Sequence, residues 1–436
     1  MSLNLSSKIL SLPGQRVNQV QHDFEHQRLT LTCTRDRRYR AIDPISRKPA
    51  TVNHYQRRTI RDLPLCGFNC YLEIELAQVI TSSDRRLLEK ADFVDKGSRY
   101  TTRFCQLVSG LCRHMSISTV SRHLNIRWET VKNMDKFYLE STLPALDPSQ
   151  LKDIKYIGVD EVARAKGHDY MTVIYDMVSG QLIGVETGRT ASVFINFLTA
   201  LPAETATNIE AVAMDMGPAY QKAVRDCLPN ADIVFDRFHV MKNYSKAIGN
   251  QRRIEYRKAN KADKALIKGT HYLLLKNADK LNETQTEKLN KLLDENVNLN
   301  TLYVLKEQLQ ALWKAEDVET MQANLEQWCL IAESTNMTYL KTFAKSLRKH
   351  REGICNYAKH KLTSARIEAG NVSIGMIRKR ARGIKDTDYF KLKIRQSSMP
   401  DDQSMFYRCL MISLCSILAC NLPHESGEEP FKLTAF

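Results

Sequence analysis

The sequence contains no apolar run long enough to cross a lipid bilayer, which takes about 20 residues in a helix. Its longest apolar stretch, CLMISLCSILAC at 409–420, is shorter, and we expect it to form a buried helix. The amino-terminal MSLNLSSKILSLPGQ lacks the apolar core and cleavage site of a secretory signal. Repeats and low-complexity tracts are also missing. We therefore expect a cytoplasmic protein without a membrane partner.

A disulfide framework is missing as well. Eleven cysteines are scattered along the chain, and their spacing suggests no set of disulfides. Several lie in apolar surroundings, as reduced core cysteines do: Cys227, Cys329, Cys409, Cys415 and Cys420. This usage fits a reducing compartment.

Acidic residues are too few to balance the basic ones. The 436 residues include 64 lysines and arginines against 49 aspartates and glutamates, a formal net charge of +15. The hydrophobic fraction of 43% and the charged fraction of 26% are otherwise those of a globular protein of two or three domains. The excess of positive charge favours nucleic acid as a partner, although charge that only aids solubility explains it equally well.

Residues 100–142 follow a helix-turn-helix pattern. A short helix at 118–124 is followed by a break at 125–127 and by a second helix beginning near Trp128. The pattern carries donors suited to phosphates and base edges: Arg122, His123, Arg127, Lys132 and Lys136. We expect DNA binding here; the alternative is a helical hairpin inside an enzyme.

Downstream of a proline-containing linker at 143–150, the chain alternates strand and helix patterns in the order βββαβαβ. The strands are expected at 154–159, 170–178, 181–188, 209–216 and 231–240, and the helices at 192–202 and 218–229. This order fits an α/β fold with a mixed sheet of the ribonuclease H type. Residues 241–360 are helical and charged without a strand pattern, so we expect an all-helical insertion, and a further helix follows at 362–383.

The expected domains are a β-rich, arginine-rich module, a helix-turn-helix domain with linker, a catalytic domain in two parts, and the insertion between those parts. Their boundaries are 1–95, 96–150, 151–240 with 359–436, and 241–358.

Two aspartates stand where we expect neighbouring strands to end. Asp160 closes the apolar run IKYIGV, and Asp215 closes AVAM. Two adjacent anions repel each other unless a cation lies between them. Mg²⁺ and Mn²⁺ take oxygen ligands, and two such ions about 4 Å apart can run phosphodiester chemistry. Glu368, on the later helix, is the candidate third ligand.

Each carboxylate also has a structural explanation. Aspartates often end strands because they form turns, and Glu368 could be a solvated helix residue. Glu161 is expected to support the site or to face solvent.

Four segments together resemble the ISL-three family of insertion-sequence transposases: YIGVDE, DYMTVIYDMVSGQLIGVETGR, AVAMDMGPAYQKAVRDCLPNADIVFDRFHVMK and SARIEAGNVSIGMIRKRARGIKDTDYFKLKIR. The resemblance covers most of 151–260 and 360–396. It implies a DDE transposase with a ribonuclease H-like core and a helical insertion. By position, the implied catalytic and metal-binding triad is Asp160, Asp215 and Glu368, with two Mg²⁺ or Mn²⁺ ions.

Further residues follow from the same resemblance. DRFHV matches an Asp-x-x-His element, here Asp236 and His239, for which we expect a role beside the active site; a histidine that caps the next helix or packs on Phe238 is the alternative. The basic helix after Glu368 is expected to bind DNA through Arg378 and Arg380, together with Lys379 and Arg382.

The amino-terminal part departs from the family, whose members carry a zinc module with two Cys-x-x-Cys pairs. Here CTRD leaves Cys33 with Asp36, TSSD at 81–84 has no cysteine, and Cys66 and Cys70 belong to the stretch between the pairs. Structural zinc needs four ligands. We therefore expect a zinc-free remnant held together by strand packing.

These observations predict a bacterial, nucleoid-associated DNA transposase. It would bind terminal inverted repeats and target DNA as double strands, and cleave and join them with Mg²⁺ as a homodimer or larger assembly. The alternatives are a catalytically inactive, transposase-derived DNA-binding protein and a nuclease that cuts without joining.

Overall fold

The computed structural model describes residues 10, 12–81, 84–165 and 169–399. The apolar segment predicted to form a buried helix at 409–420 lies outside these residues. The described residues divide into two compact units, the first comprising those up to 143 together with Met399, and the second comprising those of 144–398. No helix in the described part of the chain is long and apolar enough to cross a membrane.

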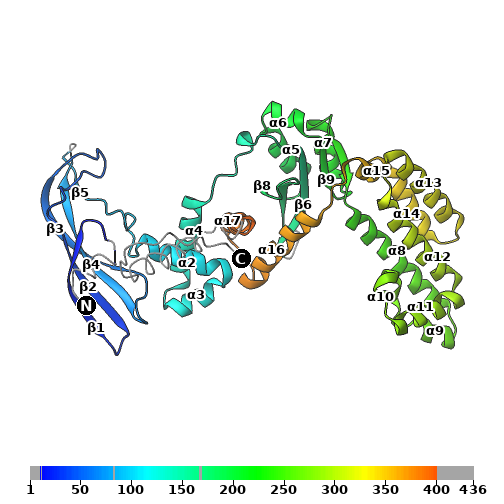
Figure 1. The fold of residues 1–436 in the computed structure, drawn as a ribbon, viewed down its shortest axis with the longest axis horizontal. Helices are drawn as coiled ribbons and strands as arrows, with labels where there is room; N and C mark the ends of the chain where they lie inside the picture. The colour runs from blue at the N-terminus through cyan, green and yellow to red at the C-terminus, as the bar shows by residue number, and fades with distance from the viewer. Residues whose placement is uncertain (1–9, 11, 82–83, 166–168, 400–436) are drawn as a thin grey trace, which may run out of the picture. The chain divides into compact units, whose positions relative to one another are not determined.

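The first unit begins with a five-stranded sheet in the order β1-β2-β4-β3, with β5 paired to β4 (Figure 1). Side chains of β4 alternate between buried and partly buried along most of the strand, as in a strand with one face on a core. The strands are β1 (Gln15–Asp23), β2 (Arg28–Arg35), β3 (Thr51–Arg61), β4 (Asn69–Ile80) and β5 (Arg86–Leu88).

The cysteines of this sheet belong to its interior rather than to a surface site. Cys33 and Cys70 lie in one apolar cluster with Leu31 and Leu72, and burial raises the pKa of both thiols to about 12. Asp36 accepts hydrogen bonds from the guanidinium groups of its neighbours Arg16 and Arg38. Among the described residues, no group of three or more His, Cys, Asp or Glu is arranged to hold a metal ion.

Three helices complete the first unit: α2 (Thr102–His114), α3 (Ile117–Leu124) and α4 (Trp128–Thr142). The side chain of Ser116 caps α3 by accepting a hydrogen bond from the amide of Thr119. Asn125 ends α3 in the left-handed conformation, with a φ of 50°, which asparagine tolerates better than most residues. The predicted break and second helix are confirmed, because α4 begins at Trp128.

The second unit contains a five-stranded mixed sheet in the order β10-β9-β6-β7-β8. β7 and β8 run antiparallel to their neighbours, whereas β9 and β10 are parallel to β6 and to each other. The strands are β6 (Tyr156–Ala165), β7 (Asp169–Asp176), β8 (Leu182–Thr187), β9 (Ala211–Met214) and β10 (Asp232–Phe235). Helices α5 (Ala191–Thr199), α6 (Ala203–Asn208) and α7 (Pro218–Cys227) join them.

Two strand boundaries differ from those expected by more than two residues. β6 does not end at Asp160; it continues to Ala165 because Asp160 and Glu161 remain paired with Val173 and Thr172 of the antiparallel β7. The run expected as a strand over 231–240 is a strand only to Phe235, because Asp236 caps a helix that begins at the next residue.

Helices alone follow β10 up to residue 360, as expected: α8 (Arg237–Lys258), α9 (Lys261–Ile267), α10 (His271–Leu275), α11 (Glu283–Glu295), α12 (Val297–Ala311), α13 (Val318–Ser334), α14 (Thr338–Lys349) and α15 (Arg351–His360). Their apolar side chains share one continuous core with α5, α7 and one face of the sheet. α15 packs against β10 and so returns the chain to the sheet.

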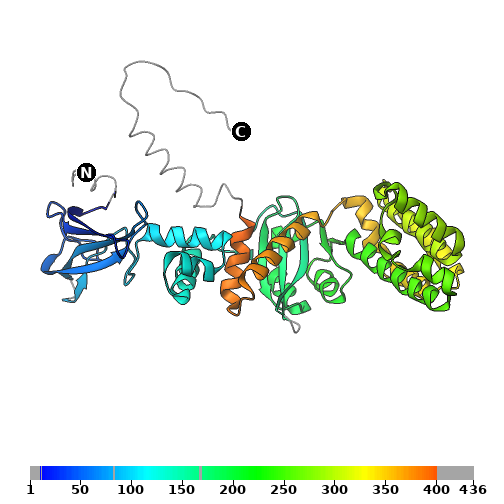
Figure 2. The ribbon, with the colours of Figure 1, turned by 90° about the horizontal axis from the view of Figure 1, so that it is seen from below.

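The opposite face of the sheet is covered by α16 (Ala365–Ala381) and α17 (Thr387–Ser398). α16 packs against β6 and α17 against β8, and both figures of the whole chain show these helices beside the sheet (Figures 1 and 2). Ile367, Ile374, Phe390 and Ile394 form the apolar cluster beneath them. The helix expected at 362–383 is thus found, with slightly narrower bounds.

Candidate active site

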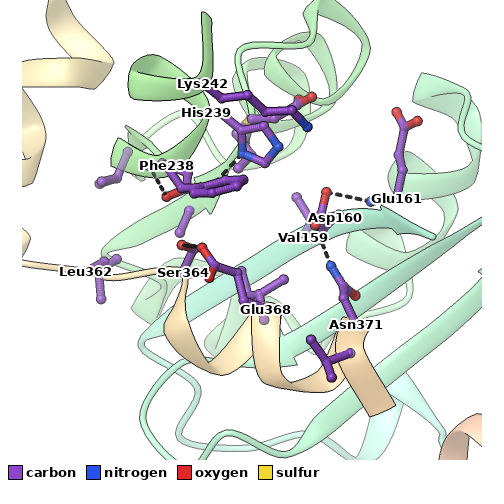
Figure 3. A pocket seen from close by; sticks show the side chains of 17 residues that line it. Val159, Asp160, Glu161, Phe238, His239, Lys242, Leu362, Ser364, Glu368 and Asn371 are labelled. Atoms are coloured by element: carbon purple, nitrogen blue, oxygen red, sulfur yellow. Dashed lines mark hydrogen bonds and ion pairs between the residues drawn. The ribbon is translucent and has the colours of Figure 1, made fainter. Parts of the chain in front are cut away.

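A pocket of about 480 Å³ opens where β6, β9 and β10 meet the beginnings of α8 and α16 (Figure 3). The three carboxylates predicted from the sequence, Asp160, Asp215 and Glu368, all line it. The other residues around it are Val159, Glu161, Ala213, Met214, Val234, Asp236, Phe238, His239, Lys242, Leu362, Ser364, Ile367, Asn371 and Val372.

Strand register explains why the two aspartates meet. Gly158 of β6 is paired with Ala213 of the parallel β9, so Asp160 and Asp215 each lie two residues beyond the same paired position. Side chains two residues apart in a strand point to the same face. Gly158 and Ala213 both contact the α16 layer. Asp160 therefore faces α16, and Asp215, which directly follows β9, lines the same pocket.

Asp160 is tightly held although it lies in mid-strand. Its Oδ1 accepts the backbone N–H of Glu161 at 2.8 Å, and its Oδ2 accepts a hydrogen bond from Nδ2 of Asn371 at 2.6 Å. Burial raises the pKa of Asp160, and the charge of Asp215 raises it further, while these two hydrogen bonds and His239 oppose the shift. The charge of Asp215 therefore acts on Asp160.

Asp215 is held by the turn that follows β9. Its Oδ1 accepts the backbone N–H of Gly217 at 2.8 Å. A Cβ atom at position 217 would stand 2.7 Å from that same oxygen, so only glycine leaves room for this carboxylate position. The tight turn aims the carboxylate at the pocket.

Glu161 belongs to the wall of the pocket. Its carboxylate lies 3.6 Å from the guanidinium of Arg189, which stacks over the ring of Tyr170. Burial and the charge of Asp215 raise the pKa of Glu161, and Arg189 opposes that shift. Glu161 is therefore an ion-paired neighbour of the aspartates.

Asp236 and His239 form a pair at the beginning of α8. Asp236 caps the helix by accepting the backbone N–H of Phe238 at 2.9 Å, and its other oxygen lies 2.8 Å from Nδ1 of His239. That hydrogen bond raises the pKa of His239. The helix cap is thus Asp236 rather than His239, and the imidazole, which also packs edge-on against Phe238, lines the pocket with its orientation fixed.

Glu368 lines the same pocket from the first turn of α16 but does not bond to the aspartates. Its exposed carboxylate accepts a hydrogen bond from the hydroxyl of Ser364 at 2.7 Å, and Figure 3 shows it turned toward that residue. The side chain of α16 that reaches Asp160 is Asn371, nearly one turn later.

Asn371 was not identified as a site residue from the sequence. The signal was present, since it follows Glu368 by three residues on an expected helix and therefore shares its face. Its Oδ1 is buried and has no hydrogen-bond partner among the described residues. An unpaired buried carbonyl oxygen is costly, and here it lies beside the carboxylates.

Two glycines seat α16 closely on the sheet. A Cβ atom on Gly158 would stand 2.6 Å from Cδ1 of Ile367, and one on Gly370 would stand 2.7 Å from Cζ of Tyr175. Both distances are too short for real side chains, so the helix approaches β6 and β7 only because these positions lack a Cβ. This approach brings Asn371 within hydrogen-bonding distance of Asp160.

The oxygen atoms around the pocket are of the chemical types that hard divalent cations bind. Carboxylate and amide oxygens are what Mg²⁺ and Mn²⁺ bind, and Asp160, Asp215, Glu368 and the unpaired Oδ1 of Asn371 supply them. Within the described part of the chain these oxygens do not converge on one point as a metal-binding group, because Glu368 is bonded to Ser364 and Asn371 presents its N–H₂ group to Asp160.

The basic residues predicted to bind DNA occupy different settings. Arg122 and Arg127 are exposed on the helix-turn-helix, while Lys132 and Lys136 are partly buried along α4. Arg378 donates to the backbone carbonyl of Ala163 and so ties α16 to β6. Arg380 is exposed near the end of α16. Neither of these two arginines lines the pocket, whereas Lys242 of α8 does.

The sequence matches two family models and several known transposases. A model described as "Transposase" matches residues 157–394, and one described as "Helix-turn-helix domain of transposase family ISL3" matches residues 89–139. The transposase for insertion sequence element IS1001 of Bordetella parapertussis is 32% identical over 342 residues, which cover 78% of this chain and 84% of the relative. The transposase for insertion sequence element IS1557 of Mycobacterium tuberculosis (strain H37Rv) is 25% identical over 351 residues, 75% of this chain and 78% of the relative.

The transposase match begins in β6, contains Asp160, Asp215 and their pocket, and ends in α17. The helix-turn-helix match spans the three helices whose break and second helix the sequence pattern predicted. With more than half of the chain matched by one family model, and a relative similar over most of both lengths, this protein belongs to the ISL3 family of insertion-sequence DDE transposases.

Proposed function

We propose that the pocket is the catalytic site for Mg²⁺-dependent DNA cleavage and strand transfer, and that Asp160, Asp215 and Glu368 hold the ions. The observation that supports this most strongly is that Asp160 of β6 and Asp215, which directly follows the parallel β9, lie equally far beyond one paired position and line a pocket that Glu368 also lines. Two carboxylates in one pocket, with the charge of Asp215 raising the pKa of Asp160, favour a cation between them. When bound, the ions would activate the attacking oxygen and stabilise the leaving oxygen at phosphorus.

The fold belongs to the same proposal. We infer a ribonuclease H-like core, supported by three antiparallel strands followed by two parallel ones in the order β10-β9-β6-β7-β8. The helices α8–α15 would be the insertion, since they separate β10 from α16 and carry no strand. The domain boundaries predicted from the sequence stay predictions.

Glu368 has a short path into the site. Its carboxylate sits on a flexible side chain whose backbone is already fixed at the rim, so rotation about its side-chain bonds, away from Ser364, would turn it toward the aspartates. Asn371 would keep Asp160 oriented while this happens.

The remaining pocket residues would position DNA. Lys242 and His239 lie on the α8 side, where they can neutralise or donate to a phosphate, and Asp236 keeps the imidazole oriented. Water would serve as nucleophile in cleavage, and the freed 3′-hydroxyl would serve in joining to target DNA.

Recognition of the element ends is assigned to the helix-turn-helix. Arg122 and Arg127 flank the turn before α4 and are exposed, as residues that contact a DNA groove must be. The proposed substrates are the terminal inverted repeats and a target duplex. Bringing two ends together calls for at least a homodimer.

Cleavage and joining assays on duplexes that carry the terminal repeats test this function. Asp160→Asn, Asp215→Asn and Glu368→Gln should each lower both rates by more than about 100-fold, because loss of a ligand costs more than the 10–100-fold typical of residues that only support one. DNA binding should persist. Glu204→Gln, an exposed carboxylate on α6, serves as the matched control and should keep full activity.

Each alternative gives a different result. A wild-type protein that binds the repeats but neither cuts nor joins them with Mg²⁺ or Mn²⁺ would be a DNA-binding protein. Cutting without joining would indicate a nuclease. Full activity in Asp160→Asn would show that the pocket is not the catalytic site.

A further inference from the structure

α8 is an amphipathic helix whose exposed face carries a line of cations. Its buried side is formed by Val240, Tyr244, Ala247, Ile248 and Gln251. On the opposite side, successive steps of three or four residues connect the pocket histidine to a series of polar and basic residues. This basic stripe consists of His239, Lys242, Lys246, Asn250, Arg253 and Arg257.

The helix geometry keeps the stripe straight. At 3.6 residues per turn, Arg257 lies five turns beyond His239 on the same face, and Arg253 lies about four turns beyond it. Glu255, the nearby acidic residue of the helix, points to the other side, where it bonds to Gln251 at 2.8 Å and to Asn298 at 3.0 Å. The stripe itself therefore carries no negative charge.

The stripe ends in a notch of about 310 Å³ lined by Arg252, Arg253, Tyr256, Arg257, Lys268 and Gly269. Arg252 uses one nitrogen to bond the carbonyl of Ile267, and its buried Nε has no hydrogen-bond partner among the described residues. Four cations thus surround one opening that has no carboxylate in its lining. A cleft lined by charge of one sign concentrates ligands of the opposite charge.

The charges that line the notch are felt by a neighbouring side chain. The pKa of His271 is lowered by burial and then by the charges of Arg252 and Arg253. Among the described residues, the side chain of Lys246 donates a hydrogen bond to the amide oxygen of Asn243, and that of Arg253 donates one to the amide oxygen of Asn250. Neither contact neutralises a charge, so these two cations of the stripe are available to an external anion.

We propose that the basic stripe and the notch of α8 bind the phosphodiester backbone of the DNA that enters the candidate active site. From His239, Arg253 lies about 21 Å and Arg257 about 27 Å along the helix axis. Successive phosphates of one strand are about 3.4 Å apart along a duplex. DNA lying along α8 would therefore meet the notch roughly six to eight nucleotides from the reacting bond. This placement rests on the proposed function of the pocket.

Salt dependence of DNA binding by the full-length protein tests the contact. The probes are a fluorescent duplex ending in the terminal repeat and a random duplex of equal length. For Arg253→Gln/Arg257→Gln, the slope of log K against log salt should fall by about two on both probes, because each lost phosphate contact removes about one unit. Lys288→Gln/Lys291→Gln removes the same charge from exposed positions of α11 and should leave the slope unchanged.

Replacing single phosphates of the DNA by uncharged methylphosphonates shows where along the strand the contact lies. Methylphosphonates placed six to eight nucleotides from the cleaved end should weaken binding of the wild type and have no further effect on the arginine double variant. Should that variant fail to fold, Lys246→Gln, which changes one exposed residue of the stripe, should lower the slope by about one. Equal slopes for the arginine variant, the α11 control and the wild type would overturn the proposal, as would insensitivity of the wild type to these phosphates.

The two proposals can fail separately. An unchanged slope in a protein that still cleaves and joins DNA removes the stripe and leaves the catalytic site. If the wild-type protein does not cleave DNA but the arginine variant still shows a reduced salt slope, the stripe remains a DNA contact and the catalytic assignment is wrong. The position of the contact is then counted from the end of the terminal repeat.

Discussion

The carboxamide of Asn371 joins the helix that carries Glu368 to the strand that carries Asp160. We expect Asn371→Ala to slow DNA cleavage by about 10–100-fold, as is usual for residues that orient a metal ligand. Loss of a hydrogen bond to a carboxylate should also lower the free energy of unfolding by about 1.5–3 kcal/mol. Single-turnover cleavage and urea denaturation measure the two effects.

Asn371→Asp separates a positioning role from simple packing. Without divalent cations, its carboxylate would repel Asp160 and lower the midpoint of thermal unfolding. Added Mn²⁺ should raise that midpoint by more than it does in the wild type, because the variant offers one more anionic oxygen. Equal responses to Mn²⁺ in both proteins would mean that position 371 lies away from the cation.

We expect the stability of the first unit to depend on pH through the carboxylate of Asp36. Hydrogen bonds from Arg38, and then from Arg16, hold the pKa of Asp36 well below its usual range. A folded-state pKa below the unfolded value means that the ionised carboxylate stabilises the fold above about pH 4. That contribution is lost as the pH falls further, toward the lowered pKa.

Asp36→Asn should therefore unfold at a lower temperature than the wild type at pH 7, and the gap should close below about pH 4. Thermal unfolding followed across pH checks this, with Glu25→Gln, exposed on the turn between β1 and β2, as the control. A gap that stays constant down to about pH 2 would show that the arginine contacts contribute no charge-dependent stability.

At the scale of elements, the seating of α16 on the sheet is decided by two positions without a Cβ. Gly370→Ala should force α16 away from Tyr175, with an overpacking cost of about 1–3 kcal/mol in unfolding free energy and a loss of cleavage activity. Gly375→Ala is the matched control on the same helix, since a Cβ there meets nothing within 4 Å. It should be stabilising by about 0.5–1 kcal/mol. Similar losses in both variants would refute close packing as the cause.

At the scale of the whole molecule, the two compact units should respond differently to divalent cations. All the proposed ligands belong to the second unit, residues 144–398. Mg²⁺ at about 100 times its dissociation constant should stabilise that unit by about 2.7 kcal/mol and leave the first unit unchanged. Hydrogen exchange resolved along the chain measures both units at once.

The control for that experiment is the double variant Asp160→Asn/Asp215→Asn, in which protection of the second unit should no longer depend on Mg²⁺. Protection that rises equally in both units, or that persists in the double variant, would show that the cation acts elsewhere. Glu204→Gln should behave as the wild type does.

Much of this architecture could be read from local patterns. The strand and helix order from β6 to β10 and the break before Trp128 depend on the periodicity of neighbouring residues, which the sequence displays directly. The candidate acids could be named because apolar runs end at Asp160 and Asp215. The end of β6 could not be read, because its extension to Ala165 depends on pairing with β7.

The sequence by itself determined which residues carry the chemistry: two aspartates after apolar runs, a glutamate on a later helix, and a surplus of positive charge. Only the tertiary structure decided how they meet. The shared register of β6 and β9 places Asp160 beside the end of β9, where Asp215 follows. The close approach of α16 brings Asn371 to Asp160, while Glu368 turns to Ser364. The reason is physical: periodicity is a property of neighbouring residues, whereas strand register and helix seating depend on side chains far apart in the chain.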